Sequence, residues 1–173
     1  LVRRIFGELK KKAEKAPEEY AIFWADFGAV VKEGLYEDAG NRDRLFEISR
    51  FRSTNGEDWI SLADYVGRMK KGQEEIYFIT GEDIDQLRVS PQLEGFSSRG
   101  IEVLLLNGPV DEFWLPTVGL FEEKPFLSVT AGGIDFAKIE TDGESGDDAD
   151  KEKPEKADAA EVAKLILVFK DAL

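Results

Sequence analysis

The chain has 173 residues, of which 42% are hydrophobic and 34% are charged, enough for one packed domain or for one domain with part of another. It contains no Cys and no His, which excludes disulfides, thiolate nucleophiles, zinc sites built on these residues and imidazole catalysis within the chain, and which fits a cytoplasmic location. The net charge of −13 disfavours contact with nucleic-acid phosphates, and no apolar run approaches the roughly 20 residues of a membrane-spanning helix, so we expect neither nucleic acid nor a membrane as a partner.

Residues 1–50 are expected to form a small helical layer. Leu1, Ile5 and Leu9 recur every fourth residue and predict a helix over 1–15. Pro17 suits the first turn of a second helix, and Gly34 is its expected end. A third short helix is expected over 41–49. The apolar stripe of the second helix follows the spacing of three and four residues and consists of Tyr20, Phe23, Trp24, Phe27 and Val31.

Residues 51–137 are expected to form a small three-layer α/β/α unit. A short strand over 51–54 precedes Ser61 and Asp64, which resemble a capping box at the start of a helix. The runs 76–80 and 103–106 are continuously apolar, which is typical of strands covered on both faces. About 20 residues with helical spacing separate them, so a parallel βαβ unit is predicted. A helix near 110–117 and a strand over 126–129 complete the unit.

The last part of the chain is expected to be a linker and an isolated helix. Residues 138–158 are rich in Gly, Asp, Glu and Lys, as flexible charged linkers are. A calcium loop starting at Asp142 fails in detail, because Asp147 stands where the loop needs Gly and Lys153 where it needs Glu. An amphipathic helix is predicted over 159–173. The fold class expected for the whole chain is therefore mixed α/β.

Several stretches resemble the heat-shock protein 90 chaperone family, and its bacterial HtpG branch more than the eukaryotic one. They keep their order along the chain and cover roughly residues 1–130. The stretch at 64–81 is similar to the middle-domain motif of the family. The others are Phe23-Trp24, Phe27-Gly28 and Lys32-Glu33-Gly34 in the helical part, and 90–94, 102–106 and 109–112 in the α/β part.

The resemblance implies that the chain is a piece of a longer, homodimeric chaperone. In the family, an N-terminal domain binds ATP with Mg²⁺, and it would precede Leu1; the dimerisation helices would follow Leu173. The piece would span the distal middle domain and, at 159–173, the first helix of the C-terminal domain. No cofactor and no ATPase activity are expected of this chain itself. Its expected partners are unfolded or partly folded client proteins and other domains of the same chaperone.

The segment 111–114 is the first candidate site. It follows a buried strand, where ligands gather in α/β sheets, and it places two aromatic side chains beside two carboxylates. The resemblance implicates this segment in client contact and points to Glu112 and Phe113, with Trp114 one place further on. The alternative is that the aromatic residues close the core.

Two further groups have a bland and a functional interpretation. The aromatic stripe at 20–27 could be an apolar contact surface, although helical spacing of this kind is more often core. Arg68, Lys70 and Lys71 could contact an acidic partner or another domain, although a solvated helix end is favoured.

Two rival functions remain open at this point. One is a structural spacer that couples ATP state to dimer closure and touches no client. The other is a small Mg²⁺-dependent α/β enzyme that uses Asp111 and Glu112.

Overall fold

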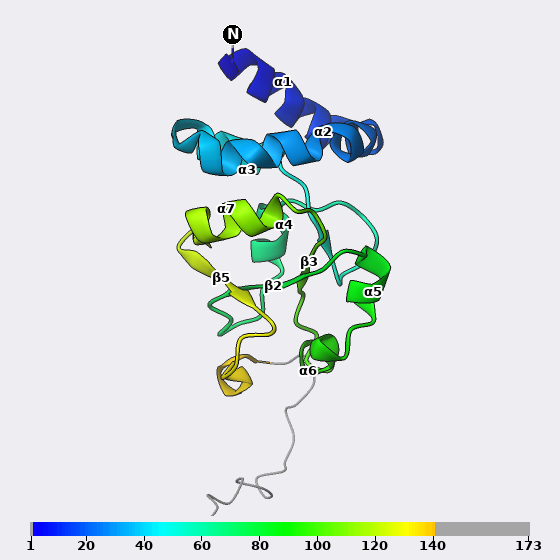
Figure 1. Cartoon of the computed structure of the whole chain (residues 1–173), viewed down its shortest axis with the longest axis vertical. Helices are drawn as coiled ribbons and strands as arrows, with labels where there is room; N and C mark the ends of the chain where they lie inside the picture. The colour runs from blue at the N-terminus through cyan, green and yellow to red at the C-terminus, as the bar shows by residue number, and fades with distance from the viewer. Residues whose placement is uncertain (1, 141–173) are drawn as a thin grey trace, which may run out of the picture. The chain divides into compact units, whose positions relative to one another are not determined.

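The computed structural model describes residues 2–140. They belong to one compact unit, Leu1–Asp142. Most of the predicted linker 138–158 and the whole predicted helix 159–173 lie outside the described residues, so both stay predictions, and so do the four predicted domain boundaries. Figure 1 shows a layer of helices above a sheet that carries further helices.

Three helices form the predicted helical layer. Their bounds agree with the sequence pattern except at the end of α2, which continues to Glu37 instead of stopping at Gly34. A Cβ added at Gly34 would lie 3.0 Å from Leu45 Cδ1, so this glycine allows α3 to pack closely on α2. The helices of the described part are α1 Val2–Lys15, α2 Pro17–Glu37, α3 Arg42–Ile48, α4 Leu62–Gly67, α5 Ile84–Arg88, α6 Glu94–Ser97 and α7 Asp111–Val118, with short 3-10 turns at Ala39–Asn41, Pro91–Leu93 and Phe136–Lys138.

The strands of the described part form one five-stranded mixed sheet in the order β1-β3-β2-β5-β4. The central strand β2 runs parallel to β3, with Phe78 opposite Leu104, and parallel to β5, with Ile76 opposite Phe126. This confirms the predicted parallel βαβ unit. The edge strands β1 and β4 are antiparallel to their neighbours. The strands are β1 Arg52–Ser53, β2 Ile76–Thr80, β3 Leu104–Leu106, β4 Leu120–Phe121 and β5 Lys124–Ser128.

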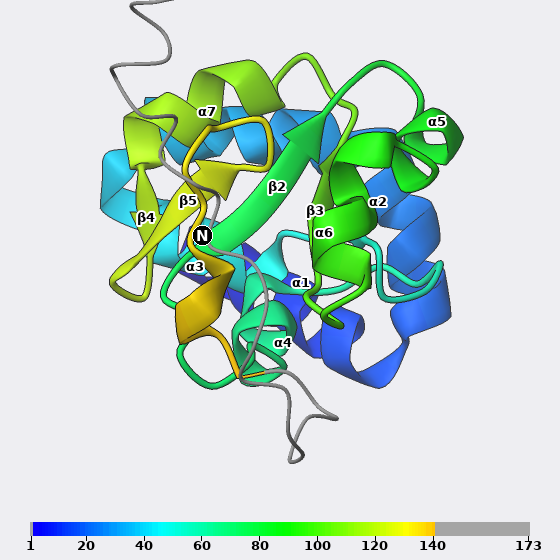
Figure 2. The same ribbon diagram turned by 90° about the horizontal axis from the view of Figure 1, so that it is seen from below.

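Both faces of the sheet are covered, which explains why the central strands are continuously apolar. Ile76 belongs to a core shared with α3, α4 and α7, whereas its neighbour Tyr77 belongs to a second core shared with α5 and α6. Successive residues of a strand point to opposite faces, so a strand with helices on both sides must be apolar throughout. Figure 2 shows this arrangement from below, with the helical layer behind the sheet.

The short helix α4 is held by a capping box at its start and by the hydrogen bonds of a buried tyrosine within it. Ser61 and Asp64 form the predicted capping box, in which each side chain accepts a hydrogen bond from the backbone N–H of the other. Tyr65 is buried, and its hydroxyl donates to the Glu102 carbonyl at 2.8 Å while it accepts from the backbone N–H of Tyr77 at 3.0 Å. One phenol thus joins α4 to both β2 and the start of β3.

Candidate functional site

The helix that follows β3 holds the candidate client-contact residues. It begins at Asp111, directly after a turn in which the Asp111 N–H donates to the Gly108 carbonyl at 2.9 Å. Asp111, Trp114 and Leu115 are buried, and their spacing of three and four residues defines the inner face of α7. Phe113 lies off this face and is 60% exposed, and Glu112 is exposed beside it.

A buried ion pair anchors the start of α7 to α2. Lys32 Nζ lies 2.8 Å from Asp111 Oδ1, and the two side chains are 12% and 1% exposed. The same oxygen accepts the indole N–H of Trp114 at 2.6 Å, and Asp111 Oδ2 accepts the backbone N–H of Gly108 at 3.2 Å. Lys32 Nζ also lies 5.0 Å from the centre of the Phe51 ring. The carboxylate therefore holds a helix, a turn and a neighbouring helix in one arrangement.

Tyr36, which lies on α2 one helical turn after Lys32, contacts Phe113 on the outer face of α7. The rings of Tyr36 and Phe113 have centroids 6.1 Å apart and an interplanar angle of 37°, a tilted pair. Tyr36 is half-buried, whereas Phe113 is mostly exposed. Sequence reasoning missed Lys32 and Tyr36 as neighbours of α7, because the ion pair joins residues 79 positions apart and no local pattern indicates it.

The expectation that Trp114 is available to a client is corrected by its burial. Its side chain has no exposed surface, and its ring packs at 5.3 to 6.0 Å, centre to centre, from the rings of Phe46, Phe51 and Phe126. The helix phase is the reason: Trp114 lies three residues after Asp111, on the inner face of α7. Of the three predicted contact residues, Glu112 and Phe113 are at the surface.

The aromatic stripe of α2 is mostly core, as its spacing favoured. Tyr20 and Trp24 are buried in a cluster with Ala13 and Ile48, and the Tyr20 hydroxyl donates to the Ile48 carbonyl at 2.6 Å. Phe27 is the exception: it is 53% exposed and stacks on Phe23.

Two members of the basic cluster that follows α4 have acidic partners within the described residues. Arg68 holds Glu102 with two hydrogen bonds of 3.0 and 2.9 Å, and Lys71 pairs with Glu140 at 2.8 Å. Lys70 also has an interaction partner. Arg68 therefore links α4 to the segment that leads into β3.

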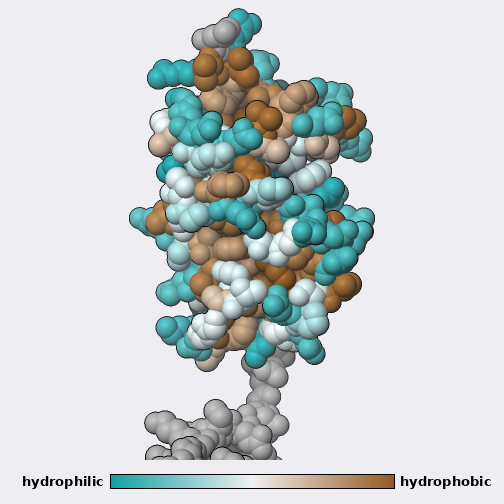
Figure 3. All heavy atoms as spheres, viewed as in Figure 1, coloured by the Kyte–Doolittle hydropathy of each residue, from teal (hydrophilic) through white to brown (hydrophobic). Residues whose placement is uncertain are grey.

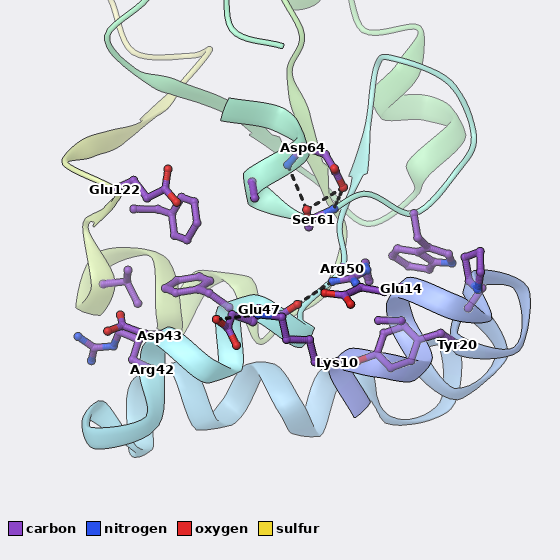
Figure 4. A pocket seen from close by; sticks show the side chains of 18 of the residues that line it. Lys10, Glu14, Tyr20, Arg42, Asp43, Glu47, Arg50, Ser61, Asp64 and Glu122 are labelled. Carbon is purple, nitrogen blue, oxygen red and sulfur yellow. Dashed lines mark hydrogen bonds and ion pairs between the residues drawn. The ribbon is translucent and has the colours of Figure 1, made fainter. Parts of the chain in front are cut away.

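A groove of about 1050 Å³ lies between the helical layer and the α/β unit. Figure 4 shows that charged side chains of both signs line it, with Ser61 and Asp64 across from Arg50 and Glu47. These charges are largely satisfied within the chain. Arg50 donates to the carbonyls of Glu47 and Ser49, and Glu47 pairs with Lys10 at 3.1 Å.

Burial in this groove shifts the pKa values of Tyr20 and of its neighbour Arg50. It raises the pKa of Tyr20 to about 12, against the effect of Arg50, whose guanidinium lies 5.2 Å from the Tyr20 ring centre. Burial also lowers the pKa of Arg50. Both shifts arise from burial, and the packed contact of Arg50 with Tyr20 opposes them, so we assign the groove a structural role.

Apolar side chains also reach the surface on α1. Figure 3 shows hydrophobic surface at the top of the view, over α1. Of the residues of this helix, Val2 and Ile5 are 54% and 51% exposed. No helix within residues 2–140 is long and apolar enough to cross a membrane.

The geometry argues against a magnesium enzyme built on Asp111 and Glu112. Asp111 is buried and both of its oxygens accept hydrogen bonds, whereas Glu112 is exposed to solvent. The two carboxylates therefore do not present a joint set of oxygen ligands. Within residues 2–140 no group of three or more acidic side chains has the geometry to hold a metal ion.

The chain is similar to bacterial chaperones along its whole length. It is 51% identical to a chaperone protein HtpG of Paramagnetospirillum magneticum over 173 residues, which are 100% of this chain and 27% of that protein. It is 50% identical to the HtpG of Roseobacter denitrificans over 98% of this chain and 27% of that protein, and 49% identical to that of Mesorhizobium japonicum over 100% and 27%. The chain thus spans about a quarter of the length of these relatives.

A solved structure and a family profile agree with these relatives. The fold is similar to the middle domain of a heat shock protein from Plasmodium falciparum, with a TM-score of 0.69 and 29% identity over 76% of this chain and 55% of that one. This likeness confirms the mixed α/β fold that the sequence predicts. The sequence profile described as "Hsp90 protein" matches residues 1–173. The chain therefore belongs to the Hsp90 protein family, and its relatives place it with the bacterial HtpG chaperones.

Proposed function

We propose that this chain is a client-contacting module of an ATP-dependent, homodimeric chaperone that assists protein folding in the cytoplasm. Its relatives are named chaperones, and its fold is that of an Hsp90 middle domain. ATP and Mg²⁺ would act in other parts of the full-length protein, and this module would not hydrolyse ATP itself. Its partners would be unfolded clients and the remaining domains of the same chaperone.

The exposure of Phe113 is the observation that carries this proposal. Phe113 is 60% exposed on a helix held by a buried ion pair, and among the described residues its aromatic ring partner is Tyr36. Exposed apolar surface at a fixed place is what a protein needs to hold the apolar segments of unfolded chains. Glu112, next to it, adds a carboxylate that reaches basic side chains of a client.

A titration with an unfolded protein tests the proposal. The anisotropy of a fluorescently labelled, permanently unfolded protein is measured as the 173-residue chain is added, for the wild type and for Phe113→Ala. Val89→Ala is the matched control, because Val89 is 80% exposed and follows α5, away from α7. We expect saturable binding that Phe113→Ala weakens by about 10-fold or more, as at a binding hot spot, and that Val89→Ala leaves unchanged. Binding that Phe113→Ala leaves unchanged would place client contact elsewhere and overturn the role of Phe113. Absence of binding by all three proteins would favour the spacer alternative, in which this module touches no client.

A further inference from the structure

The exposed ring of Phe113 is one half of an aromatic pair that two helices build together. Tyr36 lies near the end of α2 and contributes the other ring at 6.1 Å. The two residues are 77 positions apart in the sequence, and the buried pair of Lys32 and Asp111 fixes the helices on which they sit. The apolar surface around Phe113 therefore extends from α7 onto α2.

Acidic side chains surround this aromatic pair. Glu33 and Glu37 lie within one helical turn of Tyr36, and Glu112 adjoins Phe113; all three are exposed and have no hydrogen bond or ion pair within residues 2–140. Partial desolvation raises the pKa of the Tyr36 hydroxyl, and the charges of Glu33 and Glu37 add to this rise. The two carboxylates thus lie close enough to act on the Tyr36 hydroxyl.

The basic groups on the same elements are turned to internal partners. Lys32 pairs with Asp111, and Arg42, at the start of α3, donates from Nε to the Leu35 carbonyl at 2.8 Å. Lys32 is thus neutralised by Asp111, and the single charge of Arg42 is outnumbered by the three carboxylates around the pair. The surface combines two aromatic faces with a net negative rim, and cations are attracted both to carboxylates and to aromatic faces.

We infer that the surface formed by Phe113, Tyr36 and the carboxylates of Glu33, Glu37 and Glu112 binds client segments in which basic residues flank apolar ones. The inference rests on the proposed function, which it deepens by naming Tyr36 as a further contact residue and a cationic, apolar segment as the preferred ligand. An apolar side chain of the client packs on the two rings, and a Lys or Arg beside it meets the acidic rim.

Two synthetic peptides provide the test. Both carry the same Phe- and Leu-containing core, flanked by Arg in one peptide and by Glu in the other, and their binding to the 173-residue chain is measured by fluorescence anisotropy. We expect the Arg-flanked peptide to bind about 10-fold more tightly at low salt, from several exposed ion pairs acting together. The preference should shrink to below about 3-fold at about 0.5 M salt, because exposed charges are screened.

Two sets of variants assign the preference to this surface. Tyr36→Ala should weaken binding of the Arg-flanked peptide by about 3- to 10-fold, the range expected for one aromatic contact, whereas Tyr36→Phe should retain it. Glu33→Gln/Glu37→Gln should remove most of the preference for Arg. Glu18→Gln/Asp26→Asn is the matched control, because it removes two exposed carboxylates from the same helix elsewhere and should change nothing. Circular dichroism and thermal melts verify that each variant is folded.

The outcomes separate the inference from the proposed function. If Phe113→Ala abolishes binding of the unfolded protein while the Tyr36 and Glu variants leave the peptide preference intact, the inference is wrong and the proposed function stands. Unchanged affinity of Phe113→Ala for the Arg-flanked peptide places the apolar contact elsewhere and also overturns the inference. If the wild type binds neither the unfolded protein nor either peptide, both are overturned.

Discussion

The buried pair of Lys32 and Asp111 offers the sharpest test of what holds the candidate surface in place. Replacing Asp111 by Asn keeps the volume and an oxygen that accepts the Trp114 indole N–H, but it leaves the ammonium of Lys32 without its counter-charge. Lys32 is 12% exposed and Asp111 is 1% exposed, so water can replace only a small part of the lost interaction. Removing one partner of a buried pair costs about 3–5 kcal/mol of unfolding free energy, and we expect this loss for Asp111→Asn.

A double-mutant cycle measures how far the two charges depend on each other. Lys32→Met should cost a similar amount, because it strands the Asp111 carboxylate. The double variant with Asp111→Asn has no buried charge at this place. Its loss of unfolding free energy should therefore be smaller than the sum of the two single losses by about 2 kcal/mol or more. The assay is equilibrium unfolding in urea, followed by tryptophan fluorescence and by far-ultraviolet circular dichroism, which together report on whether unfolding is two-state.

An exposed pair of the same length is the control. Lys71 and Glu140 are also 2.8 Å apart, but their side chains are 80% and 65% exposed. The variants Lys71→Met and Glu140→Gln should each leave the midpoint of urea unfolding nearly unchanged, because an exposed ion pair contributes little to stability. The reasoning is refuted if the Lys32 and Asp111 losses simply add, or if they are as small as those of the exposed pair, because burial would then not decide the strength of the interaction.

Three further predictions concern stability. Tyr65→Phe leaves a buried carbonyl and a buried N–H without their partner and should cost about 1–3 kcal/mol in urea unfolding; an unchanged midpoint would contradict this. Partial burial opposes ionisation of Asp64, but hydrogen bonds from Ser61 outweigh it and the pKa of Asp64 is lowered. The stability that Asp64 contributes is therefore present above its unfolded-state pKa and is lost as the pH falls through the lower folded value. Asp64→Ala should cost about 0.5–1 kcal/mol at pH 7, and the difference from wild type should shrink when unfolding is measured at progressively lower pH. Glu122 and Glu123 have positive φ values of 47° and 64° in the turn between β4 and β5, so Glu122→Asn/Glu123→Gly should raise the melting temperature by about 2–4 °C, and a lower one would mean that the glutamates stabilise the turn.

The regular elements could be predicted because each has a local cause in the sequence. The capping box at Ser61 starts α4, the continuous apolar run over 76–80 becomes a strand covered on both faces, and Pro17 begins α2. The turn at Glu122 and Glu123 could not be predicted in this way. It uses left-handed backbone conformations that favour Gly or Asn, and the sequence offers neither residue there.

The candidate site was predictable only in part, because its chemistry depends on contacts between distant segments. The spacing of Asp111, Trp114 and Leu115 already indicates an inner face, and applied strictly it would have placed Trp114 in the core and Phe113 outside. The cation that pairs with Asp111, in contrast, could not be identified from the sequence. The charge of Lys32 is unremarkable within α2, and only the packing of α2 on α7 makes it a buried cation beside Asp111.

The residues that join α2 to α7 are different from the residues that form the exposed aromatic pair, although both sets lie on the same two helices. On α2, Lys32 holds α7 and Tyr36, one turn later, meets Phe113; on α7, Asp111 faces inward and Phe113 faces outward. Because these roles are separate, Phe113→Ala should remove contact surface at little cost in stability. Asp111→Asn, at a buried position that a client does not reach, should instead destabilise the fold and displace Phe113. If the proposed function holds, the ion pair keeps the contact surface in place while the module binds unfolded chains.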